Sequence, residues 1–436
     1  MSDSSPEESA DRQPYSVDQT KRSIFAFATG RGVVALSGFL YTVLVATHLP
    51  KEDYAVFVIL MGAALLARQI FGFGIEGVVT RFLPELCSEG ISRQALQFLG
   101  KVTYVRFLTG GCCCLLVALA ATPISVWFRS PDHDDLFRFW ALVLFFRLVF
   151  SFYRTAMGCL MWHRISAGIW GAVWLIRTGG VVGHLLVTRD IGLFEIVAYE
   201  CFCQGLGLFW SLWAYATKAY GVRDCAEEGL REVNSLHGRV ARFALYTYGT
   251  GLLGVLSTRG GLRFILATTV GAPVVAVFGF SQSIVGFVRR YSPQSLFANI
   301  TVPVLTAGFV KSADYKMLAA RHWFVLKLNL ILVAGLIVAM VVAGEQIASA
   351  MSGGRYSDAS PIVLLLLALL CVELHGTVLV DLANVSEANR SKLISSLVPS
   401  LFLIPAIFTV EKGGVTVLLG WLAAGRIAAQ IMFVHG

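Results

Sequence analysis

Five arginines lie deep within long apolar stretches of this 436-residue chain, at Arg31, Arg68, Arg147, Arg177 and Arg426. A guanidinium near the centre of a bilayer costs roughly 3 kcal/mol even on a lenient insertion scale. Arginine also keeps its charge, so it cannot avoid that cost by losing a proton. These side chains must therefore face protein or water. Because a guanidinium binds oxyanions with parallel hydrogen bonds, the five arginines predict a cavity for an anion.

The arginines of the first half outnumber the acids that could neutralise them. At the helical rise, Arg147 lies ~16 Å into its apolar stretch and Arg177 ~18 Å into the next. Glu76 and Glu200 are the only acids predicted to be clearly buried in the stretches of this half. Pairing with carboxylates to lock helices together, or reaching out to a surface, stays open as the alternative role. The residues predicted to bind the anion here are Arg31, Arg68, Arg147 and Arg177.

A weak internal repeat adds one arginine from the second half. The tripeptide Ala55–Phe57 recurs as Ala276–Phe278, and the same offset along the chain places Arg68 on Arg289. Internal repeats are typical of secondary transporters. Arg289 is therefore predicted as a fifth substrate-binding residue.

The acids within apolar stretches are candidates for binding a coupling ion. In the second half, Arg289 and Arg426 stand against Glu373 and Asp381, so this half is closer to charge balance. Intramembrane carboxylates mark ion or proton paths, but they also pair helices. Both roles stay open for Glu373, Asp381 and Glu76.

Helices must position all of these residues. The chain is 56% hydrophobic and 14% charged, and apolar runs of the ~20 residues that span a bilayer recur about twelve times. Hydrocarbon cannot satisfy an open backbone, so an all-α integral membrane protein is predicted. Ala55–Val79 is predicted as one span, and Leu393–Val410 and Gly413–Val434 as the last two.

The polar segment Lys218–Arg239 divides the chain into two sets of six spans. Lys and Arg outside the spans gather on one side, which predicts that both termini are cytoplasmic. This topology explains the net charge of +8 without nucleic acid as a partner. The predicted parts are a disordered cytoplasmic tail at 1–22, an N-lobe at 23–217, a cytoplasmic linker at 218–239 and a C-lobe at 240–436.

Signatures of enzymes are missing from the sequence. It contains no phosphate-binding loop ending in Lys-Ser or Lys-Thr, no HExxH helix and no nucleophile elbow. The acidic run at Asp132–Asp135 is typical of a solvated turn, and the nine cysteines lack zinc-ligand spacing. A non-enzyme without metal or cofactor is expected.

Several motifs resemble those of Wzx-type polysaccharide (O-antigen) flippases, a family of the multidrug/oligosaccharidyl-lipid/polysaccharide (MOP) exporter superfamily. The likeness covers nearly all of the chain, although Leu49-Pro50 lacks the usual glycine and Phe73 replaces the common leucine. The motifs are HLPKEDYAVF at His48–Phe57, GFGIE at Gly72–Glu76, RFLPE at Arg81–Glu85, GGRYSDASP at Gly353–Pro361 and NRSK at Asn389–Lys392.

The resemblance implies two pseudo-symmetric six-helix lobes around a central cavity and transport by alternating access. It implies an undecaprenyl-diphosphate-linked oligosaccharide as substrate, namely an O-antigen, capsule or exopolysaccharide repeat unit that is flipped across the bacterial inner membrane. The expected partners are membrane lipid, H⁺ or Na⁺ as coupling ion, and a polysaccharide polymerase with glycosyltransferases. The arginines would then hold the diphosphate or acidic sugars.

Two other classes of function stay open. A multidrug or cation antiporter on the same scaffold needs buried carboxylates in excess, which the arginine surplus of the first half disfavours. A membrane polysaccharide polymerase or glycosyltransferase needs a sizeable outer loop with catalytic residues, and no predicted outer loop is large enough.

Overall fold

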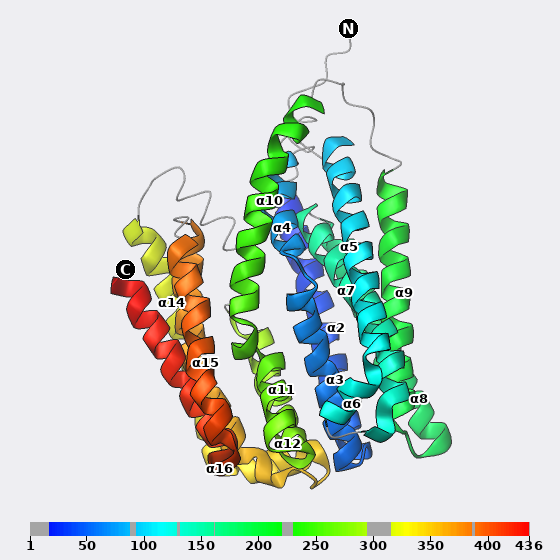
Figure 1. Cartoon of the computed structure of the whole chain (residues 1–436), viewed down its shortest axis with the longest axis vertical. Coiled ribbons are helices and arrows are strands. Elements are labelled where there is room, and N and C mark those ends of the chain that lie inside the picture. The colour runs from blue at the N-terminus through cyan, green and yellow to red at the C-terminus, as the bar shows by residue number, and fades with distance from the viewer. Residues whose placement is uncertain are drawn as a thin grey trace. The chain divides into compact units, whose positions relative to one another are not determined.

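The computed structural model describes residues 17–87, 93–128, 131–160, 162–219, 230–293, 315–385 and 389–435. For some residues in these ranges, Arg31 and Asp381 among them, only the backbone is described. Nearly all of the described residues are helical, and no strand occurs among them (Figure 1). The predicted all-α membrane fold is thus confirmed.

The described helices follow one another along the chain in two sets. The elements of the first half are α2 (Val17–His48), α3 (Lys51–Ile70), α4 (Ile75–Leu86), α5 (Arg93–Leu119), α6 (Ala121–Trp127), η1 (Pro131–His133), α7 (Asp134–Cys159), α8 (His163–Thr188) and α9 (Leu193–Ala219). Those of the second half are α10 (Leu230–Leu253), η3 (Val255–Ser257), α11 (Arg259–Thr269), α12 (Ala272–Tyr291), α14 (Tyr315–Ser352), η4 (Ser357–Ala359), α15 (Ser360–Val385) and α16 (Asn389–His435).

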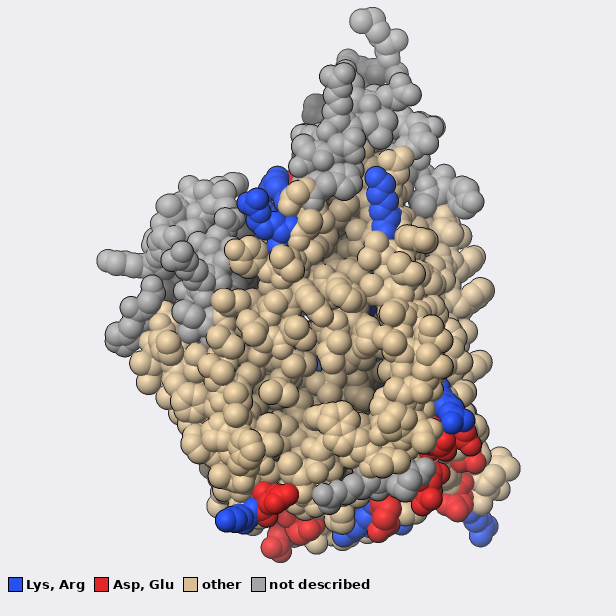
Figure 2. All heavy atoms as spheres, viewed as in Figure 1, with Lys and Arg blue, Asp and Glu red and all other residues tan. Residues whose placement is uncertain are grey.

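Nine helices of the described residues are long and apolar enough to cross a membrane. A shorter apolar stretch, Gly32–His48, lies in α2. Figure 2 shows a face with almost no Lys, Arg, Asp or Glu across its middle and with charged side chains near its edges. A surface of this kind suits lipid, so the chain is a multi-pass membrane protein.

Helix α16 contains two spans. Its 47 residues would measure ~70 Å if straight, more than twice the hydrocarbon thickness. The helix is broken at Gly414, where φ is 58° and ψ is −152°. Residues on either side of the break meet again, because the rings of Phe402 and Trp421 lie 6.3 Å apart and Gly425 packs against Pro399. The two limbs are therefore antiparallel, and the last two spans lie where the sequence predicts them.

The predicted second span is interrupted. α3 ends at Ile70 and α4 begins at Ile75, and between them Phe73 and Gly74 have positive φ angles of 47° and 70°. A β-carbon on Gly74 would overlap the carbonyl oxygen of Ala244, so glycine is required there. The apolar run hides this break because hydropathy does not report backbone conformation. Arg68 thus lies in the last turn of α3 instead of mid-span.

The helices form two compact units. Unit 1 comprises Met1–Tyr41, Ala67–Ser125 and Pro131–Gly249, and unit 2 comprises Thr42–Leu66, Val126–Ser130 and Thr250–Gly436. In unit 1, α7 packs against α5 and α9 around a buried aromatic core that includes Phe152 and Tyr153. In unit 2, α15 packs against α12, α14 and α16. Helix α7 and helix α15 are thus the central helices of their units.

Helix lengths extend the internal repeat well beyond a tripeptide. α3 and α12 each have 20 residues, and their first residues, Lys51 and Ala272, are related by the offset of the tripeptide. α7 and α15 each have 26 residues and begin at Asp134 and Ser360. η1 and η4 precede α7 and α15 at equal distances along the chain. The equal lengths indicate that the two halves repeat one pattern of helices.

The packing of the two limbs of α16 leaves no room for a side chain at Gly425. A β-carbon there would lie 2.8 Å from Phe402 and 2.9 Å from the Cα atom of Pro399. We expect Gly425→Ala to lower the free energy of unfolding by about 1–3 kcal/mol through overpacking. Thermal unfolding in detergent measures this loss. The matched control is Gly420→Ala in the same limb, where a β-carbon meets nothing within 4 Å, and equal Tm values for both variants would contradict the hairpin packing.

Candidate functional site

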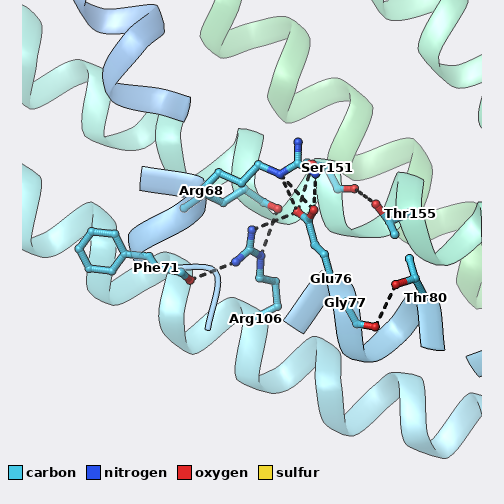
Figure 3. Close-up of polar contacts among 9 residues, drawn as sticks. Arg68, Phe71, Glu76, Gly77, Thr80, Arg106, Ser151 and Thr155 are labelled. Atoms are coloured by element: carbon cyan, nitrogen blue, oxygen red, sulfur yellow. Dashed lines mark hydrogen bonds and ion pairs between the residues drawn. The ribbon is translucent and has the colours of Figure 1, made fainter. Parts of the chain in front are cut away.

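The first charge cluster of unit 1 surrounds Glu76, in the first turn of α4. The Nε atom of Arg68 donates to both carboxylate oxygens at 3.1 and 3.0 Å, and its Nη2 atom donates to Oε2 as well (Figure 3). Ser151 of α7 donates to Oε1 at 3.3 Å. The Nη2 atom of Arg106, from α5, lies 3.6 Å from the same oxygen. One carboxylate therefore joins four helices and faces two guanidinium groups.

Arg106 is the member of this cluster that the sequence analysis missed. Its side chain is 0% exposed, and it donates to the carbonyl oxygens of Leu148 at 3.2 Å and Phe71 at 3.1 Å. Phe71 lies in the break between α3 and α4, so Arg106 satisfies a carbonyl group that the interrupted helix leaves open. The available signal was the position of Arg106 between Val105 and Phe107 within an apolar helix.

The second cluster of unit 1 surrounds Glu200 of α9. Nη1 of Arg177, from α8, lies 3.0 Å from Oε2, and Nη1 of Arg147, from α7, lies 3.5 Å from Oε1. Gln204, one turn further along α9, donates to Oε1 at 2.8 Å. The carboxylate is only 1% exposed. Three neighbouring helices are thus joined through one buried acid.

The two arginines of this cluster differ in their surroundings. Arg177 is 4% exposed, and its guanidinium lies over the rings of Trp174 at 4.5 Å and Tyr41 at 5.7 Å. Aromatic faces stabilise a desolvated cation, so Arg177 is held within the packing of unit 1. Arg147 is 32% exposed. Of the two, Arg147 is the one that a ligand can reach.

The third cluster lies in unit 2 and surrounds Glu373 of α15. Arg289, in the last turn of α12, donates from Nη1 to Oε2 at 2.6 Å. Arg426 of α16 forms an ion pair with Oε1 and donates from Nη2 to the carbonyl oxygen of Ser257 at 3.3 Å. Each carboxylate oxygen therefore binds a different arginine. Arg289 and Arg426 thus both pair with Glu373, while the side chain of Asp381 lies outside the described residues.

A cavity of about 280 Å³ adjoins this third cluster. Gln430 borders it and donates to the carbonyl oxygen of Val372 at 2.7 Å, while its own oxygen lies 2.8 Å from Nδ1 of His375. The cavity therefore combines charged, polar and apolar walls. It is lined by Ser257, Arg289, Glu373, Gly376, Thr377, Leu379, Val380, Pro399, Arg426, Ala429, Gln430 and Phe433.

The repeat relates the second and third clusters with their charges exchanged. At the offset that aligns the first residue of α7 with that of α15, Arg147 corresponds to Glu373 and Glu200 corresponds to Arg426. Gln204 corresponds to Gln430 at the same offset. Each half thus joins equivalent helices with an ion pair, but the acid and the base have changed places. The repeated tripeptide does not reveal this exchange.

The predicted site residues therefore fall into separate clusters. Arg147 and Arg177 meet at Glu200, Arg68 meets Glu76, and Arg289 meets Glu373 in the other unit. The side chains of Arg31 and Asp381 lie outside the described residues. Among the side chains that the structure describes, each of the three clusters pairs two arginines with one glutamate.

The difference in burial between Arg177 and Arg147 can be tested by removing each charge in turn. We expect Arg177→Gln to lower the free energy of unfolding by about 3 kcal/mol, because it breaks a buried ion pair. Arg147→Gln should cost about 1 kcal/mol or less, because Arg147 is partly exposed and Glu200 keeps Arg177 at 3.0 Å as its partner. Denaturant or thermal unfolding of both variants in the same detergent gives the comparison. Equal losses for the two would contradict the assignment of Arg177 to packing and of Arg147 to ligand access.

Comparison with known proteins places the fold among membrane transporters. The sequence matches no family model and no curated protein. Its structure is similar to the lipid II flippase MurJ in an inward closed conformation, with a TM-score of 0.68, 13% identity and coverage of 94% of this chain and 86% of that one. It is also similar to the MATE multidrug transporter DinF-BH in complex with rhodamine 6G, with a TM-score of 0.68, 15% identity and coverage of 97% and 95%.

A third similar structure is an inward-facing multidrug resistance MATE family transporter of the MOP superfamily. Its TM-score is 0.63 at 14% identity, over 92% of this chain and 93% of that one. Identities this low carry information on the fold alone. The chain therefore has the fold of the MOP-superfamily transporters.

Proposed function

We propose that this protein is a transporter that flips a lipid-diphosphate-linked oligosaccharide across the bacterial inner membrane by alternating access of its two halves. The observation that carries the proposal is the ratio of two arginines to one glutamate in all three clusters of the described helices. Positive charge that remains after pairing favours an anionic ligand, and a diphosphate is the most highly charged part of such a lipid.

The arginines differ in their proposed roles because their side chains differ in exposure. Arg68, Arg147 and Arg289 keep 42%, 32% and 43% of their side-chain surface exposed, so they are placed to contact the diphosphate or acidic sugars. Arg177 orients Glu200 and thereby Arg147. Arg31 completes the set as a predicted substrate-binding residue. The glutamates keep the guanidinium groups apart and oriented while no substrate is bound.

Ion coupling is the second part of the proposal. Glu76, Glu373 and Asp381 are its candidates, with H⁺ or Na⁺ as the driving ion. Glu76 and Glu373 each bind two arginines, so uptake of a cation there requires that at least one arginine leaves the carboxylate. An anionic substrate that binds those arginines would free the carboxylate for the ion. Substrate and ion binding are coupled in this way without any covalent step.

A multidrug antiporter is the second candidate function, and the likeness to a transporter structure in complex with rhodamine 6G favours it. A cationic drug needs a carboxylate that is not neutralised. Glu76, Glu200 and Glu373 each face two guanidinium groups, which disfavours a cationic substrate at these three positions. The flippase is therefore the better-supported function.

Substitution of Arg147, the more exposed arginine of its cluster, distinguishes the flippase from the multidrug antiporter. In proteoliposomes with a fluorescent prenyl-diphosphate-linked disaccharide, we expect Arg147→Ala to slow flipping at least tenfold, since a charge-assisted hydrogen bond to phosphate is lost. Access of dithionite to the label from outside measures the rate. Arg81→Ala, which removes an exposed pair with Glu85, serves as the matched control and should keep the rate of the unmodified protein.

Export of rhodamine 6G from the same proteoliposomes is the measurement that tests the antiporter. If the protein exports rhodamine 6G and flips no labelled lipid, the antiporter replaces the flippase as the function.

A further inference from the structure

Phe73 is an exposed aromatic residue in the break between α3 and α4. It keeps 44% of its surface exposed, and its backbone has a φ angle of 47°, which residues other than glycine rarely adopt. Its neighbours, Gly72 and Gly74, have no side chains that could cover the ring. Phe73 also stands where leucine is common in the similar flippase motif. A bulky residue in a strained backbone conformation, exposed instead of buried, is typical of a functional site.

Tyr248 of α10 holds the ring of Phe73 in place. The two rings are stacked, with their centroids 5.0 Å apart and their planes inclined by 24°. Helix α10 lies close to the break, because a β-carbon on Gly74 would overlap the carbonyl oxygen of Ala244. The stacked rings, named here the Phe73–Tyr248 pair, therefore form an oriented aromatic surface within unit 1.

The Phe73–Tyr248 pair adjoins a charged and hydrated part of unit 1. The ion pair between Arg68 and Glu76 joins the two ends of the segment that carries Phe73 near its middle. Five residues of extended chain span at most ~18 Å, so the backbones of Arg68 and Phe73 lie within that distance. The side chain of Arg68 is 42% exposed, and an exposed guanidinium requires water around it. An aromatic surface and a wet cationic surface thus lie next to each other.

A sugar ring is the ligand that matches such a surface. One face of a pyranose consists mainly of C–H bonds, whose positive ends suit the negative face of an aromatic ring. The hydroxyl groups of the same sugar point outward and stay in water. A lipid chain could also cover Phe73, but it would not accommodate the neighbouring charge of Arg68. A flat cationic drug could stack on the ring as well, but the guanidinium of Arg68 repels it.

We propose that the Phe73–Tyr248 pair is a sugar-binding subsite, on which a pyranose ring of the lipid-linked oligosaccharide stacks beside Arg68. Phe73 supplies the stacking surface, and Tyr248 holds it in orientation. The inference rests on the proposed function for the kind of ligand, and it adds the residues that recognise the sugar.

Comparison of two ligands, one with sugar and one without, tests the subsite. The full-length protein in phosphatidylcholine nanodiscs is titrated calorimetrically with a prenyl-diphosphate-linked disaccharide and, separately, with farnesyl diphosphate. We expect Phe73→Leu to weaken binding of the disaccharide ligand about fivefold, because the aromatic stacking is lost. Binding of farnesyl diphosphate should stay unchanged. Phe73→Tyr keeps the ring and should bind the disaccharide ligand as the unmodified protein does.

Phe209→Leu is the matched control, since Phe209 is an exposed phenylalanine of α9 in the same unit. It should bind both ligands as the unmodified protein does. Equal weakening for the two ligands in Phe73→Leu would show that Phe73 acts through the fold, and disaccharide binding that is unchanged would show that no sugar stacks there. Either result overturns the inference.

Failure of the inference and failure of the proposed function give different results. If the unmodified protein binds and flips the disaccharide lipid while Phe73→Leu binds it equally well, the inference alone fails. If the unmodified protein binds no disaccharide lipid, with or without export of rhodamine 6G, both fail.

Discussion

A guanidinium group that enters an apolar helix must find a carboxylate, a carbonyl oxygen, an aromatic face or water, because lipid offers none of these. Three clusters in the described part of this protein meet that requirement with one glutamate between two arginines. Around Glu76 the same requirement explains a break in the backbone, since Arg106 binds the carbonyl oxygen of Phe71 between α3 and α4. The pairing of buried charges therefore also determines where the helix is interrupted.

The described side chains of each cluster include more arginines than glutamates. A carboxylate with two oxygens can accept from two arginines, which leaves one unit of positive charge in each cluster when the described side chains are counted. A fully neutralised interior would hold helices together equally well, and apolar packing would do so with a smaller cost of desolvation. The proposed anionic ligand accounts for more arginines than acids among the described side chains, and Arg68, Arg147 and Arg289 are the more exposed members of their clusters.

The repeat shows how one scaffold acquired different chemistry in its two halves. α7 and α15 have the same length and occupy the centre of their units, and each is joined to a neighbouring helix by an ion pair at equivalent positions. With Arg147 and Glu200 in one half, and Glu373 and Arg426 in the other, the helix contact is preserved while the acid and the base change places. In unit 1 the arginine is much more exposed than its acid, at 32% against 1%, whereas in unit 2 the two are similar, at 19% and 15%.

Apolar runs, buried arginines and a faint repeat determined the fold class, most of the spans and the need for an anion or a carboxylate beside each arginine. These follow from composition and from the rise of a helix, which puts Arg147 ~16 Å into its apolar stretch. The partners could not be predicted, because a helix that is apolar all round does not reveal which face meets which neighbour. Glu373 and Arg426 lie on different helices and meet only through the packing of α15 on α16. The break before Gly74 and the burial of Arg106 likewise depend on contacts between helices, which hydropathy does not encode.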